Sequence, residues 1–132
     1  MQRRFFCLSF AACAVPSVAS SYPSVPYVRE TWEDLQSRSD KIVLNWRATW
    51  SLTCQRKSEI LGQLVVENPS YTAITFVDVD WDTFGPSVWA ERLKIKRRST
   101  LVAMRNKREI TRIENKPDIV SVRRFLDAVL DA

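Results

Sequence analysis

The chain has 132 residues, of which 45% are hydrophobic and 27% are charged, and its formal net charge is +5. This length fits one domain, and no stretch approaches the roughly 20 apolar residues that a membrane span requires. The sequence has no histidine and only two glycines, so it lacks the commonest general base and metal ligand and the glycine-rich loops that cradle phosphates, and we expect no metal and no cofactor.

Residues 1–28 predict a targeting leader followed by a proline-containing linker or arm. No acidic residue precedes Glu30, while arginines and serines recur, which is typical of a mitochondrial transit peptide. A secretory signal is the alternative, because an apolar run over residues 5–15 precedes a small-residue cleavage site at 17–19. An arm retained for packing is the third. Two of the three cysteines lie in this segment, so a processed domain keeps only Cys54 and cannot form an internal disulfide, which favours mitochondria over secretion.

The first half of the remaining chain predicts two helices that alternate with two strands. A hydroxyl cap followed by acids predicts a short helix from Thr31 to about Ser39. The nearly continuous apolar run in residues 41–48 predicts a strand that is buried on both faces. Apolar residues at helical spacing predict a helix over residues 52–67 that ends at Asn68-Pro69. Residues 71–79 are rich in β-branched and aromatic residues and predict a second buried strand.

The second half predicts a hairpin between two helices. A short helix is expected to follow Gly85-Pro86-Ser87 and to run to Leu93. Strands at 100–104 and 109–113 flank a polar turn at 105–108, and the last helix begins near Pro117. The predicted fold is therefore α/β, a three-layer sandwich with a mixed sheet of about four to five strands flanked by helices, over residues 29–132.

The order of these elements and four short segments resemble the thioredoxin-like superfamily. Residues 42–54 (IVLNWRATWSLTC) are similar to its strand and active-site segment, in which a tryptophan precedes C-x-x-C at the start of a helix. Residues 76–80 (FVDVD) are similar to its central strand, 95–101 (IKRRSTL) to its cis-proline segment, and 105–109 (RNKRE) to its hairpin turn. The likeness covers about residues 30–131.

The residues that carry thioredoxin chemistry differ in this chain. By this resemblance Ser51 replaces the attacking cysteine, Asn45 the buried acid and Ser99 the cis-proline, while Trp50 and the resolving Cys54 remain. A serine without an adjacent base does not attack a disulfide, and an asparagine does not relay protons. A cis bond before a non-proline residue costs about 3–4 kcal/mol, so we expect a trans peptide and a reshaped loop at Ser99. We expect Cys54 to pack as a small half-buried side chain.

Basic residues are concentrated late in the chain. Residues 30–93 hold six basic and ten acidic side chains, whereas residues 94–124 hold eleven basic and three acidic ones. An arginine-rich surface can neutralise phosphates, so ribosomal RNA is one predicted partner. An acidic protein surface, or a solvated face without a partner, is the alternative. The candidate contact residues are Lys94, Lys96, Arg97, Arg98, Arg105, Lys107, Arg108, Arg123 and Arg124.

The tryptophans and one acidic run allow further interpretations. Most of the five tryptophans are expected to pack in the core, with Trp50 and Trp81 as the best candidates for an interface. Asp78, Asp80 and Asp82 alternate, but no histidine or glutamate accompanies them, so we predict no metal site there.

These observations predict a redox-inactive structural subunit, not an enzyme, that works by contact within a large mitochondrial assembly. A ribosome or its assembly machinery is favoured, and a respiratory or ATP synthase complex comes next; protein subunits are the expected partners. Two alternatives stay open. One is a single-cysteine thiol protein that acts through Cys54, and the other is a secreted or lumenal binder that holds clients without oxidising them.

Overall fold

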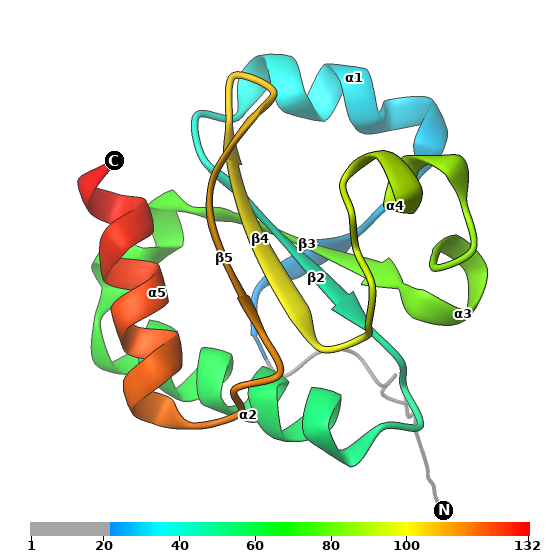
Figure 1. Cartoon of the computed structure of the whole chain (residues 1–132). Helices are drawn as coiled ribbons and strands as arrows, with labels where there is room; N and C mark the ends of the chain where they lie inside the picture. Colours follow the sequence, from blue (N-terminus) through cyan, green and yellow to red (C-terminus); the bar gives the residue numbers. More distant parts are fainter. Residues whose placement is uncertain (1–21) are drawn as a thin grey trace, which may run out of the picture.

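The computed structural model describes residues 22–132, which form a five-stranded mixed sheet with helices on both faces (Figure 1). The strands lie in the order β1-β3-β2-β4-β5. Strands β1, β2 and β3 pair in parallel, whereas β4 is antiparallel to both β2 and β5. Their bounds are β1 Ser24–Pro26, β2 Ile42–Arg47, β3 Thr75–Asp80, β4 Thr100–Arg105 and β5 Arg108–Glu114.

The helices form the two outer layers of the sandwich. Helices α2 and α5 cover one face of the sheet, and α1, α3 and α4 cover the other (Figure 1). The bounds are α1 Arg29–Arg38, α2 Leu52–Glu67, α3 Trp81–Phe84, α4 Val88–Arg92 and α5 Ile119–Asp131, with a 3-10 helix at Pro69–Ala73. The α/β three-layer fold predicted from the sequence is therefore confirmed, with five strands. None of the helices within residues 22–132 is long and apolar enough to cross a membrane.

Side-chain alternation along the central strand divides the interior into two cores. In β2, Val43 faces α2 and α5, whereas Leu44 and Trp46 face the other helical layer. This follows from the period of two in a strand, which sends successive side chains to opposite faces of the sheet. Because both faces are covered, Ile42–Trp46 is buried along its whole length, which explains why all of its residues except Asn45 are apolar.

Local sequence fixes the ends of the principal elements. Helix α2 begins at its cap Ser51, and α5 begins at Asp118, whose carboxylate accepts from the Ser121 amide at 2.9 Å. Asn106 and Lys107 both have positive φ, at 52° and 67°, and they connect β4 to β5 as a two-residue turn. Turns of this kind match the twist of the strands and require φ above zero at both residues.

The sheet includes residues that the sequence analysis assigned to a linker or arm. Ser24–Pro26 pairs with β3 and Tyr22 is buried in the core, so the folded domain begins before residue 29. The prolines on either side of this segment argued for a linker, but β1 is an edge strand, where a missing N–H does not break a ladder. The predicted leader lies mostly in residues 1–21, outside the described residues.

A buried polar cluster attaches this first strand to the sheet. The Tyr22 hydroxyl donates to Asp78 and accepts from Asn45 at 2.9 Å, and Ser24 donates to Asp78 at 3.0 Å. We expect Tyr22→Phe to lower the free energy of unfolding by about 1–3 kcal/mol, because it removes two hydrogen bonds from a buried polar cluster. Urea denaturation would measure this loss. Tyr27→Phe is the control, since its ring packs on Trp89 at 4.4 Å and its hydroxyl has no hydrogen bond within residues 22–132; an equal loss in both variants would contradict the role of the cluster.

Two elements differ from their predicted extents. Residues 71–73 belong to the 3-10 helix that Asn68 caps, so β3 begins at Thr75. Helix α3 was not predicted, because it spans four residues and depends on its cap Asp80, whose carboxylate accepts from the Thr83 amide at 3.1 Å. The remaining predicted helices and strands agree with the structure to within a few residues.

Candidate functional site

The junction between β2 and α2 holds the segment that resembles the thioredoxin active site. Ser51 is only 3% exposed, and its hydroxyl accepts from the Cys54 amide at 3.3 Å. It therefore caps α2, a position where serine is among the preferred residues. The oxygen at the start of this helix is engaged by the backbone and faces away from solvent.

Cys54 lies one turn further along α2 and is 1% exposed. Its sulfur accepts from the Ala48 amide at 3.4 Å. Among residues 22–132 it is the one free cysteine. The thiol is thus more deeply buried than the half-buried side chain we expected. Thiol exchange requires that a disulfide reach a thiolate. The Cys54 sulfur is enclosed, so a disulfide does not reach it from the surface of the domain.

Ser99 lies where the resemblance places the cis-proline. No cis peptide bond occurs in the described part of the chain, and Ser99 has φ of 61°. The expectation of a trans peptide in a reshaped loop is therefore confirmed. The Ser99 amide donates to the Trp46 carbonyl at 2.7 Å, which ties the loop to β2. Its buried hydroxyl has no hydrogen-bond partner among the described residues.

A buried lysine of α2 forms a hydrogen bond to the loop at Ser99. Lys57 is 0% exposed, and its ammonium donates to the Ser99 carbonyl at 2.5 Å. The same carbonyl also accepts from the Asn115 amide at 2.9 Å. Burial is the main cause that lowers the pKa of Lys57 to about 8, because a charged amine is costly away from water. The lysine therefore connects α2, the loop and the residue after β5.

Asn45, which stands where the family has a buried acid, belongs to the polar cluster of the first strand. It is 1% exposed and donates to the Tyr22 hydroxyl. Burial, followed by the neighbouring Asp78, raises the pKa of Tyr22 well above its usual value. Tyr22 thus stays protonated at neutral pH. The cluster holds strands together, and neither the Tyr22 phenol nor the Asn45 amide exchanges protons near neutrality.

Trp50 is the exposed member of the predicted site. Its side chain is 58% exposed, in contrast to its neighbour Ser51. The indole N–H donates to both carboxylate oxygens of Asp82, at 3.1 and 3.0 Å, and the Arg98 guanidinium lies 4.8 Å from the ring centroid. Trp81, the other predicted interface residue, instead packs against the core beside α4. The expectation that most tryptophans pack holds for the remaining three, Trp32, Trp46 and Trp89.

The nine predicted contact cations do not form one patch. Lys94, Lys96, Arg97 and Arg98 lie together between α4 and β4. The turn cations lie at the other end of β4, about 17 Å away at the usual rise of a strand. There Arg105 pairs with Asp40 at 3.2 Å and Lys107 with Glu33 at 3.6 Å, while Arg108 forms no ion pair with a described residue. Arg123 and Arg124 are on α5, in the opposite layer to α4, and Arg123 pairs with Glu67 at 3.3 Å.

The three alternating aspartates perform separate structural tasks. Asp78 joins the Tyr22 cluster, Asp80 caps α3 and Asp82 accepts from Trp50. Within residues 22–132 no three His, Cys, Asp or Glu side chains come together as a group that could hold a metal ion.

The fold and the β2–α2 junction together define a thioredoxin fold, and solved structures show the same likeness. Trxlp from Edwardsiella tarda is 21% identical with a TM-score of 0.69, over 79% of this chain and 98% of that protein. Mitochondrial thioredoxin 3 from Saccharomyces cerevisiae is 19% identical with a TM-score of 0.67, over 86% and 100%. Thioredoxin NaTrxh from Nicotiana alata is 16% identical with a TM-score of 0.69, over 86% and 98%. No family model and no curated protein sequence matches the chain.

Three important residues were not singled out by sequence reasoning. Lys57 could have been found, because it falls among apolar residues at helical spacing on α2, where a lysine is unusual. Tyr22 was obscured by the neighbouring prolines. Arg112 of β5 was not recognised, since the two backbone carbonyls that it binds lie 18 and 19 residues earlier in the chain.

Proposed function

We propose that this protein is a binding subunit with a thioredoxin fold that does not catalyse thiol–disulfide exchange. The observation that carries the proposal is the state of position 51, where a serine hydroxyl is buried and caps α2. Exchange begins when an exposed thiolate attacks a disulfide, and no such group stands at the start of this helix. The protein then acts by binding other molecules through the exposed surface of the domain.

Three further features support this proposal. Cys54 is enclosed and would need local opening before it met a disulfide, which disfavours the alternative of a single-cysteine thiol protein. Asn45 hydrogen-bonds within a structural cluster and does not supply the proton relay of a carboxylate. The large exposed side chain near the junction, Trp50, is the kind of residue that contributes strongly to interfaces.

An insulin-reduction assay with dithiothreitol tests the proposal. We expect the wild-type chain to give the background rate of dithiothreitol alone, and Cys54→Ser to give the same rate, because neither protein exposes an attacking thiolate within residues 22–132. An authentic thioredoxin serves as the positive control. Turnover by the wild type that disappears in Cys54→Ser would overturn the proposal and favour the single-cysteine alternative.

We further propose that the protein is a subunit of a large mitochondrial assembly, and we favour a ribosome or its assembly machinery. Support comes from the composition of residues 1–29 and from the basic second half of the sequence. Sedimentation of mitochondrial extracts, with and without RNase, tests it. We expect the protein in heavy fractions, whereas migration as a free small protein, or recovery from the secretory pathway, would contradict this setting.

A further inference from the structure

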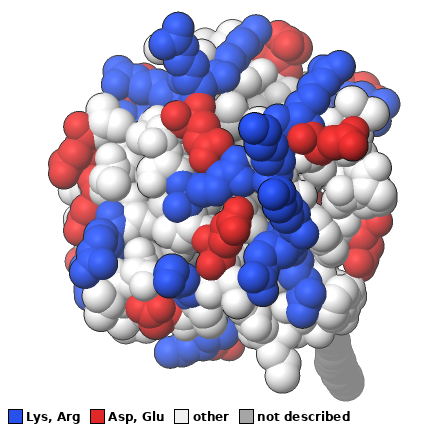
Figure 2. Space-filling view, in the orientation of Figure 1, with Lys and Arg blue, Asp and Glu red and all other residues white. Residues whose placement is uncertain are grey.

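The segment between α4 and β4 carries a concentrated positive charge. Figure 2 shows Lys and Arg side chains in a band on this face, where Figure 1 has that segment. Within six residues the chain presents Lys94, Lys96, Arg97 and Arg98, all exposed. We refer to residues 94–99 as the basic loop.

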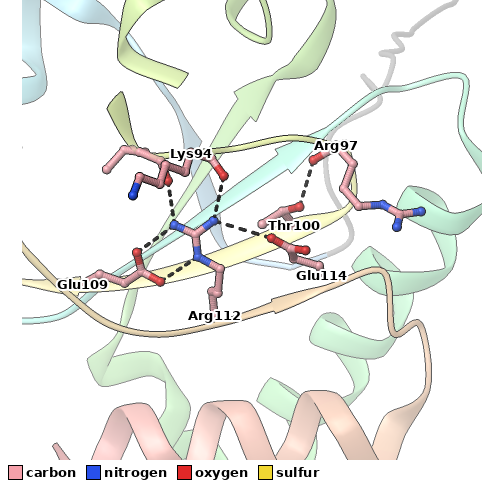
Figure 3. A network of polar contacts seen from close by, with 7 residues as sticks. Lys94, Arg97, Thr100, Glu109, Arg112 and Glu114 are labelled. Atoms are coloured by element: carbon pink, nitrogen blue, oxygen red, sulfur yellow. Dashed lines mark hydrogen bonds and ion pairs between the residues drawn. The ribbon is translucent and has the colours of Figure 1, made fainter. Parts of the chain in front are cut away.

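The basic loop is held in one conformation by contacts from several elements. Arg112 of β5 donates to the Leu93 carbonyl at 2.7 Å and to the Lys94 carbonyl at 3.1 Å (Figure 3). The Thr100 hydroxyl donates to the Arg97 carbonyl at 2.8 Å. At the far end, Ser99 is tied to β2, Lys57 and Asn115 as described above. The loop is therefore fastened at both ends and near its centre.

Backbone strain shows that these contacts determine the shape of the loop. Lys94 and Ser99, its first and last residues, have φ of 59° and 61°. Residues other than glycine seldom adopt this left-handed conformation, which persists only where the surroundings impose it. A loop fixed in this way loses little conformational entropy when a partner binds.

The cations of the loop are left without acidic partners, although acids lie close by. Arg112 occupies both nearby glutamates, Glu109 at 2.6 Å and Glu114 at 3.6 Å, and this contact lowers the pKa of Glu109. None of the four loop cations forms an ion pair with another residue that the structure describes. In Figure 3 the Arg97 guanidinium points away from the network around Arg112. The loop thus displays charge that nothing in the described domain neutralises.

An aromatic platform borders this charge. Trp50 is fixed by its bonds to Asp82 and by Arg98 over its ring, yet more than half of its side chain stays exposed. Proteins that bind single-stranded nucleic acids combine cations along the backbone with aromatic rings on which bases stack. An acidic peptide would use the cations but has no need of a fixed, exposed indole.

We infer that the basic loop and Trp50 form a binding site for single-stranded nucleic acid, in which Lys96, Arg97 and Arg98 contact phosphates and Trp50 stacks on a base. This site rests on the proposed function as a binding subunit and names the kind of molecule that the subunit binds. The cations of the β4–β5 turn and of α5 are not part of the site.

Fluorescence anisotropy with the full chain and a short labelled oligouridylate tests this site. We expect the triple variant Lys96→Gln, Arg97→Gln, Arg98→Gln to bind at least about tenfold more weakly. A plot of log affinity against log salt concentration should have a slope shallower by about 2 for this variant than for the wild type, because each of the three phosphate contacts adds about 0.7 to the slope. Trp50→Leu should weaken binding about tenfold with an unchanged slope, since stacking releases no counterions.

The matched control removes three charges from the turn: Arg105→Gln, Lys107→Gln and Arg108→Gln. It has the same net charge as the loop variant, so equal losses of affinity in both would show non-specific attraction and overturn the site. Displacement of the oligouridylate by polyglutamate at equal charge would overturn it in favour of an acidic protein, and equal affinity for a duplex would overturn the preference for single strands. If binding fails while the insulin assay stays at background, the inference falls and the proposed function stands.

Discussion

A Ser51→Cys variant is expected to form an internal disulfide with Cys54. Position 51 caps α2 and lies three residues before Cys54. Helix geometry places Cα atoms at this spacing about 5 Å apart, which is within the range of about 4.4–6.8 Å found in disulfides. Trypsin releases residues 48–56 as one peptide that contains both positions. Mass spectrometry of the oxidised protein should find this peptide lighter by two hydrogen atoms.

The matched control for this experiment is Gln55→Cys. It places the new thiol in the same peptide but adjacent to Cys54, where the Cα separation of about 3.8 Å is too short for an unstrained bridge. We expect no internal disulfide in this variant. Absence of the bridge in Ser51→Cys would contradict the geometry assigned to the β2–α2 junction.

The bridged variant is still expected to be a poor catalyst of insulin reduction. Asn45 does not relay a proton, and the loop at Ser99 lacks the proline of the family. We expect turnover above background but at least about tenfold below an authentic thioredoxin, since general acid–base catalysis contributes about 10²- to 10⁴-fold. Activity equal to thioredoxin would show that Ser51 alone separates this chain from the redox enzymes.

Lys57→Met is expected to stabilise the protein near neutral pH. Burial holds the pKa of Lys57 at about 8 in place of 10.5, which corresponds to a cost of about 3 kcal/mol for keeping the amine charged in the folded state. Methionine removes this cost and fills similar space. The Ser99 carbonyl loses one donor but keeps the Asn115 amide, so we expect a net gain of about 1–3 kcal/mol at pH 7.

The pH dependence distinguishes this explanation from a packing effect. Between pH 8 and 10.5 the unfolded wild type binds more protons than the folded protein, so its free energy of unfolding rises with pH in this window. The advantage of Lys57→Met should therefore shrink by about 3 kcal/mol from below pH 8 to above 10.5. Urea denaturation at several pH values measures it. Lys116→Met, at an exposed position, is the control for the loss of a lysine charge. A difference in the free energy of unfolding between Lys57→Met and the wild type that stays constant with pH would contradict the buried charge.

Elements whose pattern is local could be predicted from the sequence. The continuous apolar run of β2, the helical spacing in α2 and α5, and the polar turn of the β4–β5 hairpin each follow from residues close together in the chain. The first strand was missed because its stability comes from β3 and from the Tyr22 contact with Asp78, 56 residues away. The prolines near residues 24–26 argued against a strand there, and the local sequence does not show whether a strand lies at the edge of a sheet.

The site was predictable in composition but not in arrangement. Ser51, Asn45 and Ser99 could be assigned from the segments that resemble thioredoxin, yet their roles as helix cap, cluster member and strained loop end follow only from the three-dimensional structure. The cations were predicted as a set, but a count of charges does not show which of these cations form ion pairs with acidic side chains. Arg112 decides that for the basic loop, because it engages both Glu109 and Glu114 and leaves the loop cations unpaired.

The serine that caps α2 makes a cysteine at position 51 energetically costly. Oxygen accepts a hydrogen bond from the helix terminus better than sulfur, so a reduced chain with cysteine at this position would lose about 1 kcal/mol of helix stability. In a reducing compartment, where thiols prevail, a single substitution to cysteine would therefore weaken the protein before it supplied any electron transfer.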